Sequence, residues 1–389
     1  MKKVYAGVFG SGLGHITRIR SISDGLQGSE EVEFLYSTFD EAYELLLRVQ
    51  APVVRSPSVG VEWNVAGGFS GKDTIVRFPL YSIRFSKQVA FEIDQIAGYN
   101  PRVVLSDSRL SSIIASKARL FPVVTVLNQF KVLFPPRFRM SSLSKLYERF
   151  AGDVLGLLWT LSDEVLFPDL PPPYTLGEAN VAGTDVSNKV RYTGFMNQKK
   201  QSTAERLEYV RRLLSLDKRP IVFIQISGPE PTKPGFINAA MSSAKLLCEE
   251  YNVVVSKGHP RGSEIPFRLS NGCWVYEWCP VKDELFQLSD IVVARAGHTT
   301  LSQCIESGKP AVTVPIYNHS EQIWNAKKFV DMNLGLSIKS ETLTAKSLVQ
   351  AVRACQEDDS FREHAMKLKQ VSDRYDGVAT AVETVREFF

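Results

Sequence analysis

Short apolar runs recur along the first half of the chain, and each is followed by a turn and a longer segment of helical character. These runs lie at residues 3–9, 32–36, 103–105 and 123–127. Continuous apolar runs of this length are typical of parallel strands that are buried on both faces. Strands that alternate with helices predict a doubly wound parallel sheet, with ligands at the carboxyl ends of its strands.

The same pattern restarts in the second half. Residues 197–218 are polar and charged, which predicts a linker and a surface helix. New apolar runs then follow at 221–226, 253–256, 274–276, 291–294 and 311–314. We therefore expect two Rossmann-like domains that face a cleft, residues 1–196 and residues 197–372, followed by a final helix within residues 373–389.

Composition narrows the class of protein. The chain has 389 residues, 44% hydrophobic and 23% charged, which suits a globular protein of two or three domains. A formal net charge of +4 is too weak to imply a nucleic-acid partner. Met1 leads directly into a predicted strand, and no apolar run reaches the roughly 18 residues of a membrane span, so we expect a cytoplasmic protein. The five cysteines lack the spacing of a metal or redox motif, which favours buried, reduced thiols.

The strongest chemical signal follows the apolar run at 291–294. Gly297 permits a tight turn and a close approach of the backbone to a ligand. The next three residues open a helix whose N–H groups form a ready anion site: His298, Thr299 and Thr300.

Further polar residues extend this site. Glu306 lies two helical turns after Thr299, on a similar side, and offers a carboxylate for ribose hydroxyls. Glu321 and Gln322 start another helix and are candidates for contacts with a sugar. The alternatives are a solvated role for Glu306, and capping of the second helix by Asn318 or Ser320.

This segment resembles the donor-sugar half of GT-B glycosyltransferases, and in particular glycosyltransferase family 28, which includes the bacterial enzymes that form lipid II. The residues that carry the resemblance are Arg295-Ala-Gly297, Thr300, Glu306, Gly308-Lys-Pro310, Pro315 and Gln322-Ile-Trp-Asn325-Ala326. The resemblance implies a nucleoside diphosphate sugar as donor, with a UDP-sugar preferred. It also implies that Glu306 binds ribose and that the final helix crosses back to the first domain.

The same resemblance gives roles to two shorter segments. Ser227 and Gly228 follow the first strand of the second domain and are expected to face the donor. The family contacts uracil through backbone groups at the position of Trp278 and Cys279. Side-chain identity at that position is therefore uninformative.

The glycine loop after the first strand is Gly10-Ser-Gly12-Leu-Gly14-His15. It is not a dinucleotide fingerprint, because histidine stands where the third glycine would be and no acidic residue ends the second strand. The lipid II enzymes have Gly-Gly-Thr-Gly-Gly-His here, so Gly10, Gly14 and His15 match. We expect Gly12 and Gly14 to let the backbone and the helix N-terminus approach the donor diphosphate.

His15 is the candidate general base, because an imidazole titrates near neutral pH and can take the proton of an acceptor hydroxyl. Asp107 ends another strand of the same sheet and could hold the tautomer of His15. The alternatives are that His15 only binds substrate, and that Asp107, Ser106 or Ser108 caps a helix. Asn128 and Gln129, which follow the next strand, are candidates for acceptor contacts.

These residues predict an inverting glycosyl transfer. No Asp-x-Asp motif stands out, so we expect no metal ion and no cofactor, with helix dipoles taking the charge of the leaving diphosphate. Two other functions stay open: a UDP-sugar 2-epimerase on the same fold, and a non-catalytic protein that binds nucleotide sugars.

The acceptor is the least determined part. Residues 76–85 and 130–140 interleave aromatic and basic residues, as surfaces that dock on anionic lipid do. They favour a lipid-linked acceptor and a peripheral position on the inner face of a membrane. The alternative is a core-facing stripe with charged edges, and neither segment matches a nucleic-acid module.

Overall fold

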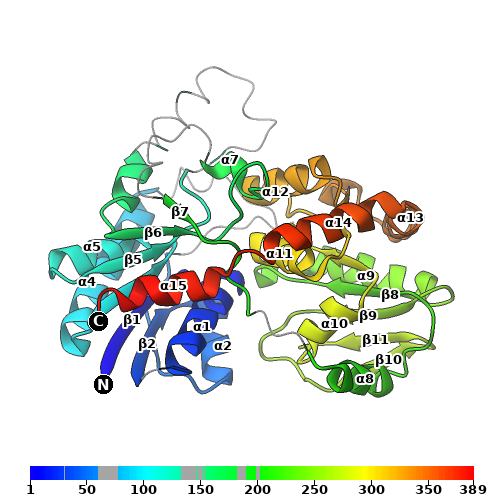
Figure 1. The fold of residues 1–389 in the computed structure, drawn as a ribbon, viewed down its shortest axis with the longest axis horizontal. Helices are drawn as coiled ribbons and strands as arrows, with labels where there is room; N and C mark the ends of the chain where they lie inside the picture. The colour runs from blue at the N-terminus through cyan, green and yellow to red at the C-terminus, as the bar shows by residue number, and fades with distance from the viewer. Residues whose placement is uncertain are drawn as a thin grey trace. The chain divides into compact units, whose positions relative to one another are not determined.

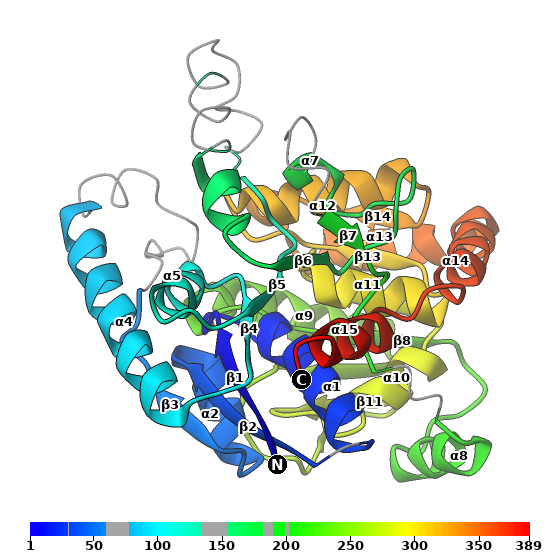
Figure 2. The same cartoon turned by 60° about the vertical axis from the view of Figure 1, so that its left-hand side comes forward.

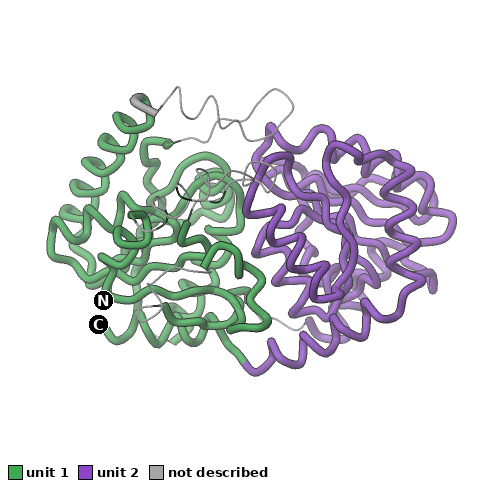
Figure 3. The backbone as a smooth tube through the Cα atoms, turned by 90° about the horizontal axis from the view of Figure 1, so that it is seen from above, with its two compact units in different colours: residues 1–62, 70–198, 375–389 green, residues 63–69, 199–374 purple. Residues whose placement is uncertain are grey.

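The computed structural model describes residues 1–29, 31–59, 78–131, 133, 146, 152, 154–181, 190–198 and 202–389. The chain divides into two compact units (Figure 3). Among the described residues, unit 1 contains those up to 198 together with 375–389, and unit 2 contains 202–374.

Unit 1 is built on a parallel sheet in the order β3-β2-β1-β4-β5-β6-β7. The chain adds strands toward one edge from β1 to β3 and toward the other edge from β4 to β7, so the direction of winding reverses between β1 and β4. These two strands pair directly, with Val8 opposite Asp107. The reversal is the point at which open α/β sheets bind ligands. The strands are β1 Lys2–Val8, β2 Val32–Thr38, β3 Val53–Arg55, β4 Val103–Asp107, β5 Val123–Val126, β6 Glu164–Phe167 and β7 Val190–Tyr192.

Helices cover this sheet on both faces (Figures 1 and 2). On one side α4 packs beside α5, around a core that includes Tyr5, Val104 and Ile113. The last helix, α15, packs beside α1, and Asp376 caps it by accepting a hydrogen bond from the amide of Ala379 at 2.9 Å. The helices are α1 Gly14–Gln27, α2 Asp40–Arg48, α4 Phe78–Tyr99, α5 Leu110–Ala118, α7 Glu178–Val181 and α15 Gly377–Arg386.

Unit 2 repeats the plan with the strand order β10-β11-β9-β8-β12-β13-β14. Its order reverses between β8 and β12, and its pairs are parallel except for the antiparallel β10–β11 hairpin. The strands are β8 Ile221–Gln225, β9 Asn252–Ser256, β10 Phe267–Ser270, β11 Cys273–Tyr276, β12 Ile291–Ala294, β13 Ala311–Thr313 and β14 Gly335–Ser337.

The helices of unit 2 also form two layers. On one side α9 packs against α13, and on the other α11 packs against α10 and α14 (Figure 1). The helical elements are α8 Ala204–Leu213, η3 Glu230–Thr232, α9 Pro234–Leu247, α10 Lys282–Leu288, α11 His298–Ser307, α12 Ser320–Asp331, η4 Ser340–Thr342, α13 Ala345–Glu357 and α14 Asp359–Ser372.

The predicted doubly wound architecture is confirmed in both units. Every strand expected from an apolar run is present, with its ends within two residues of the prediction. The predicted surface helix in 197–218 is α8, which Thr203 caps by accepting a hydrogen bond from the amide of Arg206. The strands that were not predicted include the three-residue edge strands β3 and β14 and the hairpin strand β10. Their sequences are VVR, GLS and FRLS, and none contains three apolar residues in a row, so their pairing comes from the rest of the sheet.

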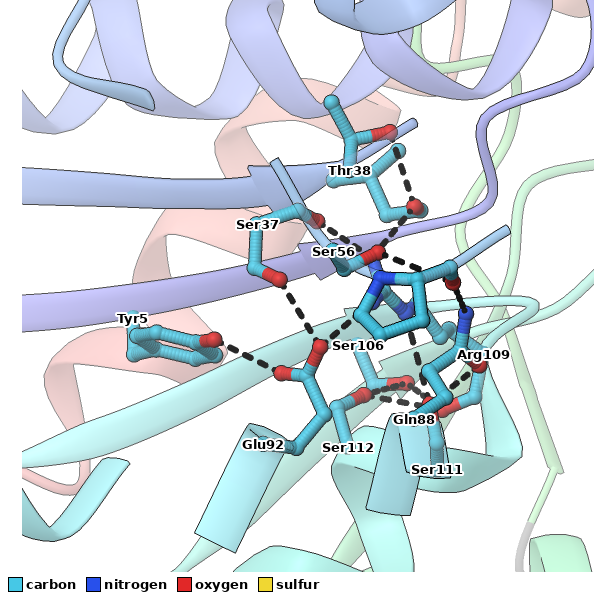
Figure 4. A network of polar contacts seen from close by, with 12 residues as sticks. Tyr5, Ser37, Thr38, Ser56, Gln88, Glu92, Ser106, Arg109, Ser111 and Ser112 are labelled. Carbon is cyan, nitrogen blue, oxygen red and sulfur yellow. Dashed lines mark hydrogen bonds and ion pairs between the residues drawn. The ribbon is translucent and has the colours of Figure 1, made fainter. Parts of the chain in front are cut away.

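A buried polar network braces the carboxyl edge of the first sheet (Figure 4). Glu92 of α4 is fully buried and accepts hydrogen bonds from the hydroxyl groups of Tyr5, at 2.7 Å, and Ser37, at 2.8 Å. It also pairs with Arg109, whose Nη1 donates to the carbonyl oxygen of Val8 at 3.0 Å. Burial and the Glu92 carboxylate raise the pKa of Tyr5 well above its ordinary value, so Tyr5 stays a neutral donor. The network holds the loop between β4 and α5, to which Arg109 belongs.

No helix among the described residues is long and apolar enough to cross a membrane. Most of the aromatic and basic segment 130–140 lies outside the described residues, as do residues 76 and 77 of the other segment. The rest of that segment begins α4, where Leu80 and Ile83 are exposed. The alternative of a core-facing stripe is therefore wrong for these two side chains.

Candidate functional site

The reversal point of the first sheet brings two predicted residues together. His15 is the second residue of α1, just after the glycine loop that follows β1, and Asp107 is the last residue of β4. His15 Nδ1 lies 2.7 Å from Asp107 Oδ1. The His15 side chain is 22% exposed and that of Asp107 is fully buried, so only the imidazole can meet a substrate.

A residue that sequence reasoning missed, Arg18, completes this group. Its Nε and Nη2 donate to the two oxygens of Asp107, and its side chain is nearly buried. Burial by itself raises the pKa of Asp107, but Arg18 and His15 outweigh it and lower that pKa below its usual value. The sequence could have indicated Arg18 by its spacing. Arg18 lies three residues after His15 on α1, and residues three apart on a helix share a face.

The ionised Asp107 sets the role of each nitrogen in His15. A carboxylate only accepts hydrogen bonds, so Nδ1 of His15 carries the proton and Nε2 is left as the basic atom. The ring of Phe9 packs edge-on against the imidazole, with centroids 5.4 Å apart, and limits its rotation. The alternative that Asp107 caps a helix is wrong, because the N-cap of α5 is Arg109 and has no side-chain cap.

The glycine loop combines open space with bonds to two carboxylates. Gly12 has φ +82°, and a Cβ built on it would meet nothing within 4 Å, so space beside the backbone is open. However, its amide donates to Glu41 Oε2 at 3.2 Å, and Ser11 donates to Asp40 at 3.3 Å. The amide of Gly12 is therefore already bonded within the protein, and the diphosphate contact expected at Gly12 and Gly14 stays a prediction.

The two candidates for acceptor contacts have different environments. Asn128 is 5% exposed, and its Oδ1 accepts a hydrogen bond from Arg18 Nη2 at 3.2 Å. Gln129 is partly exposed at the same sheet edge. Asn128 therefore helps to hold Arg18, the partner of Asp107. Gln129 is the more accessible of the two candidates.

The reversal point of the second sheet brings together Ser227 and Gly228, after β8, and Gly297, after β12. Gly228 has φ +104°, which favours glycine. Gly297 has φ −71° and is the N-cap of α11, so its conformation does not require glycine. A Cβ there would meet nothing within 4 Å, and the backbone borders open space.

The N-terminus of α11 offers fewer amides than predicted. The amide of Thr300 donates to the carbonyl oxygen of Gly297 at 3.1 Å, so the helix itself uses it. The side chains of His298 and Thr300 are buried, and Thr299 is partly exposed. The anion site expected here therefore rests on the helix dipole and the amides of the first two helical residues.

Glu306 lies in the last turn of α11, which ends where Gly308 adopts φ +65°. At 1.5 Å per residue, Glu306 is roughly 12 Å along the axis from His298. Gln303 is partly exposed on a similar side and lies one turn nearer the N-terminus. Gln303 therefore competes with Glu306 for the predicted contact with ribose.

The start of α12 is capped by His319, not by Asn318 or Ser320. Its Nδ1 accepts a hydrogen bond from the amide of Gln322 at 3.4 Å. Gln322 Oε1 in turn accepts from the amide of Ile316 at 3.0 Å. Burial lowers the pKa of His319, which keeps the ring neutral with its proton on Nε2. Gln322 thus holds the loop after β13 besides its predicted role at the sugar.

Two further predicted residues follow β11. The amide of Trp278 donates to the carbonyl oxygen of Ser263 at 3.0 Å, so it is already used within the protein. The backbone contact with uracil expected at Trp278 and Cys279 stays a prediction, with the amide of Trp278 already bonded. Cys279 is 5% exposed, and burial raises the pKa of its thiol to about 12.

The second half of the chain matches a known family. Residues 233–380 match the profile of the glycosyltransferase family 28 C-terminal domain. An uncharacterized glycosyltransferase of Methanopyrus kandleri is 25% identical over 326 residues, covering 82% of this chain and 88% of that relative. A UDP-N-acetylglucosamine–N-acetylmuramyl-(pentapeptide) pyrophosphoryl-undecaprenol N-acetylglucosamine transferase of Exiguobacterium is 28% identical over 182 residues, covering 45% of this chain and 50% of that enzyme.

Solved structures show the same architecture over the whole chain. The spinosyn rhamnosyltransferase has a TM-score of 0.68 at 14% identity and covers 99% of this chain and 100% of its own. A glycosyltransferase of Streptomyces sp. SF2575, complexed with thymidine diphosphate, has a TM-score of 0.64 at 14% identity and covers 100% of both chains. The chain is therefore a glycosyltransferase of the GT-B fold in which residues 233–380 are similar to the family 28 C-terminal domain.

Proposed function

We propose that this protein is an inverting glycosyltransferase that uses a UDP-sugar, such as UDP-N-acetylglucosamine or UDP-glucose. The single observation that carries the proposal is the His15–Asp107 pair, with a partly exposed imidazole held at 2.7 Å by a buried carboxylate. The choice of UDP follows the name of the Exiguobacterium relative. The complex of the Streptomyces glycosyltransferase makes thymidine diphosphate the second nucleotide to test.

The first unit supplies the acid–base chemistry. Nε2 of His15 takes the proton of an acceptor hydroxyl as its oxygen bonds to the anomeric carbon of the sugar. The bond between that carbon and the diphosphate breaks, and its electron pair leaves with the diphosphate. Asp107 stabilises the imidazolium that forms and holds the ring in the productive tautomer. Direct attack by one nucleophile inverts the anomeric centre.

The second unit binds the donor. The N-terminus of α11 favours the charge of the diphosphate through its dipole, so the transfer needs no metal ion. Glu306 or Gln303 binds the ribose hydroxyl groups, and Glu321 and Gln322 contact the sugar. Ser227 and Gly228 border the same sheet edge.

The acceptor in this proposal is a lipid-linked hydroxyl or phosphate group at the inner face of a membrane. Its support is the order of aromatic and basic residues in 76–85 and 130–140. The exposed Leu80 and Ile83 on the described part of the first segment agree with such a surface.

The alternatives have weaker support. A UDP-sugar 2-epimerase needs no base for an acceptor hydroxyl, and a protein that only binds nucleotide sugars needs no base at all. Burying the carboxylate of Asp107 beside His15 lowers the stability of the fold. A histidine that serves as a base gives a functional reason for this burial, and the two alternatives do not.

Donor binding is tested by calorimetric titration of the protein with UDP and thymidine diphosphate. Glu306→Ala should weaken binding of the preferred nucleotide by roughly 1.5–3 kcal/mol, because a charge-assisted hydrogen-bond pair is lost. Gln303→Ala is the matched variant one turn away. If only Gln303→Ala weakens binding, the ribose contact belongs to Gln303, and unchanged affinity in both variants would remove the ribose site from α11.

Catalysis is tested by the release of UDP in the presence of acceptors, with His15→Ala against the wild type. Turnover should fall by about 10²–10⁴, the usual range for loss of a general base, while UDP affinity stays near normal. His364→Ala is the control, because His364 is exposed on α14. Near-normal turnover of His15→Ala would assign the base to another residue.

A further inference from the structure

Arg295 stands out as a buried cation at the reversal point of the second sheet. It follows β12 directly, is 4% exposed, and precedes the N-cap of α11 by two residues. Its side chain cannot touch a ligand in solvent. Any effect on a ligand must therefore act through its charge or through the loops that it holds.

The guanidinium ties together several loops at this edge. Nη1 donates to the carbonyl oxygen of Val314 at 3.0 Å, and Nη2 donates to that of Thr232 at 2.6 Å. Nη1 also donates to the Ser340 hydroxyl at 3.4 Å. The Cζ atom of the guanidinium lies 4.8 Å from the centroid of the Phe236 ring. Arg295 thus connects the loops after β8, β13 and β14. These contacts are all to neutral groups.

The other two buried arginines of the described chain have a different environment. Arg18 pairs with the buried carboxylate of Asp107, and Arg109 pairs with that of Glu92. Arg295 makes no ion pair with a carboxylate among the described residues, and its Nε has no hydrogen-bond partner there. Burial lowers its pKa to about 10, so it stays charged at neutral pH. A buried charge without a counter-ion is unfavourable unless an anion compensates it.

The field of this charge reaches the second helix of the site. After burial, the charge of Arg295 is among the causes that lower the pKa of His319, the N-cap of α12, against the opposing effect of Glu321. The charge of Arg295 therefore acts on the N-cap of α12, and Arg295 itself lies two residues before the N-cap of α11. A buried charge is screened less than an exposed one, so it acts over a longer distance.

We propose that Arg295 is the positioning residue for the diphosphate of the donor, which it attracts through the protein without contact. Together with the dipole of α11, its uncompensated charge creates a positive field where the diphosphate binds. The same field stabilises the charge that the leaving diphosphate gains during transfer. This inference rests on the proposed donor site in the second unit.

The experiment compares Arg295→Met and Arg295→Lys with the wild type, titrating each protein with UDP and with uridine. Arg295→Met should bind UDP about 10- to 100-fold more weakly, because the field is lost, and uridine with nearly unchanged affinity. Arg295→Lys should retain most of the UDP affinity, because the charge remains. Arg353→Met is the control, since it removes an exposed positive charge from the same unit.

The outcomes separate this inference from the proposed function. Equal loss of UDP and uridine binding in Arg295→Met, with no rescue by Arg295→Lys, would show that the residue only holds the loops, and would overturn the proposal. Unchanged UDP affinity in a folded Arg295→Met would overturn it as well. If the wild type binds neither UDP nor thymidine diphosphate, the donor site itself is wrong.

Discussion

Among single residues, the orientation of His15 depends on two charged neighbours in turn. The carboxylate of Asp107 accepts the hydrogen bond from His15 Nδ1 and so leaves Nε2 as the basic atom. Burial by itself would raise the pKa of Asp107, but the guanidinium of Arg18, which donates to both of its oxygens, lowers it. Arg18 therefore acts on His15 by keeping Asp107 ionised.

Arg18→Met should therefore shift the pH profile of kcat/KM. Without the guanidinium, burial raises the pKa of Asp107, so the carboxylate that orients His15 is lost at a higher pH and the acid limb of the profile should move to higher pH. The measurement is UDP release from pH 5 to 9, with Arg20→Met on the same helix as control. An unshifted limb with uniformly lower activity would reduce Arg18 to a purely structural role.

The lowered pKa of Asp107 also links this group to stability. Its favourable interactions are present above the ordinary carboxyl pKa of about 3.9 and are lost as the pH falls through the lower value in the folded protein. The contribution of Asp107 to folding is therefore complete at neutral pH and disappears only in acid.

At the scale of elements, α4 is joined to the sheet by a buried ion pair rather than by apolar packing alone. Arg109 connects the loop after β4 to Glu92, and its Nη1 also donates to the carbonyl oxygen of Ser37 at 2.5 Å. Gln88, one turn earlier on α4, accepts from Ser111 at 2.8 Å and donates to the carbonyl oxygen of Pro57 at 2.6 Å. These bonds hold the backbone that carries Asp107.

Arg109→Met should reduce the free energy of unfolding of the first unit by about 3–5 kcal/mol, because it leaves Glu92 buried and unpaired. Adding Glu92→Gln should recover part of the loss, since a neutral amide is cheaper to bury than a lone carboxylate. Denaturant unfolding followed by circular dichroism measures both variants. A double variant no more stable than the single one would show that the ion pair is not the cause.

At the scale of the whole molecule, the open question is the surface on which the acceptor is presented. If the aromatic and basic segments dock on a membrane, the protein should sediment with liposomes that contain anionic lipid, and less so as salt rises. Replacing Lys131, Arg137 and Arg139 by Ser should abolish sedimentation, because each basic residue contributes about 1 kcal/mol to binding an anionic surface. The triple variant should still bind UDP. Arg137 and Arg139 lie outside the described residues.

A matched triple variant in the second unit is the control. Lys327, Lys346 and Lys367 are exposed, and their replacement by Ser removes the same charge from another surface. Loss of sedimentation in both triple variants would indicate net charge rather than a docking surface. A wild type that ignores anionic liposomes at low salt would make a soluble acceptor the better hypothesis.

The amino-acid pattern was enough to predict the architecture of both units and to place candidate residues at the sheet edges. The apolar runs predicted the buried parallel strands because such strands need apolar residues on both faces. His15 and Asp107 could be placed together for the same reason, since each follows a strand of one sheet and ligands bind where strands end. The glycines at 297 and 308 marked the start and end of α11 correctly.

The partners of these residues could be identified only in the folded chain. Arg18 carries no motif, and its pairing with Asp107 arises from β1 and β4 lying side by side. The carboxylate of Glu41 reaches the amide of Gly12 from α2, 29 residues away in sequence. Arg295 was visible in the motif, but its lack of a counter-ion was not, because burial and pairing depend on every loop packed around it. Spacing along the chain places residues on a face or at an edge, whereas contacts between charges depend on segments that meet only in the folded protein.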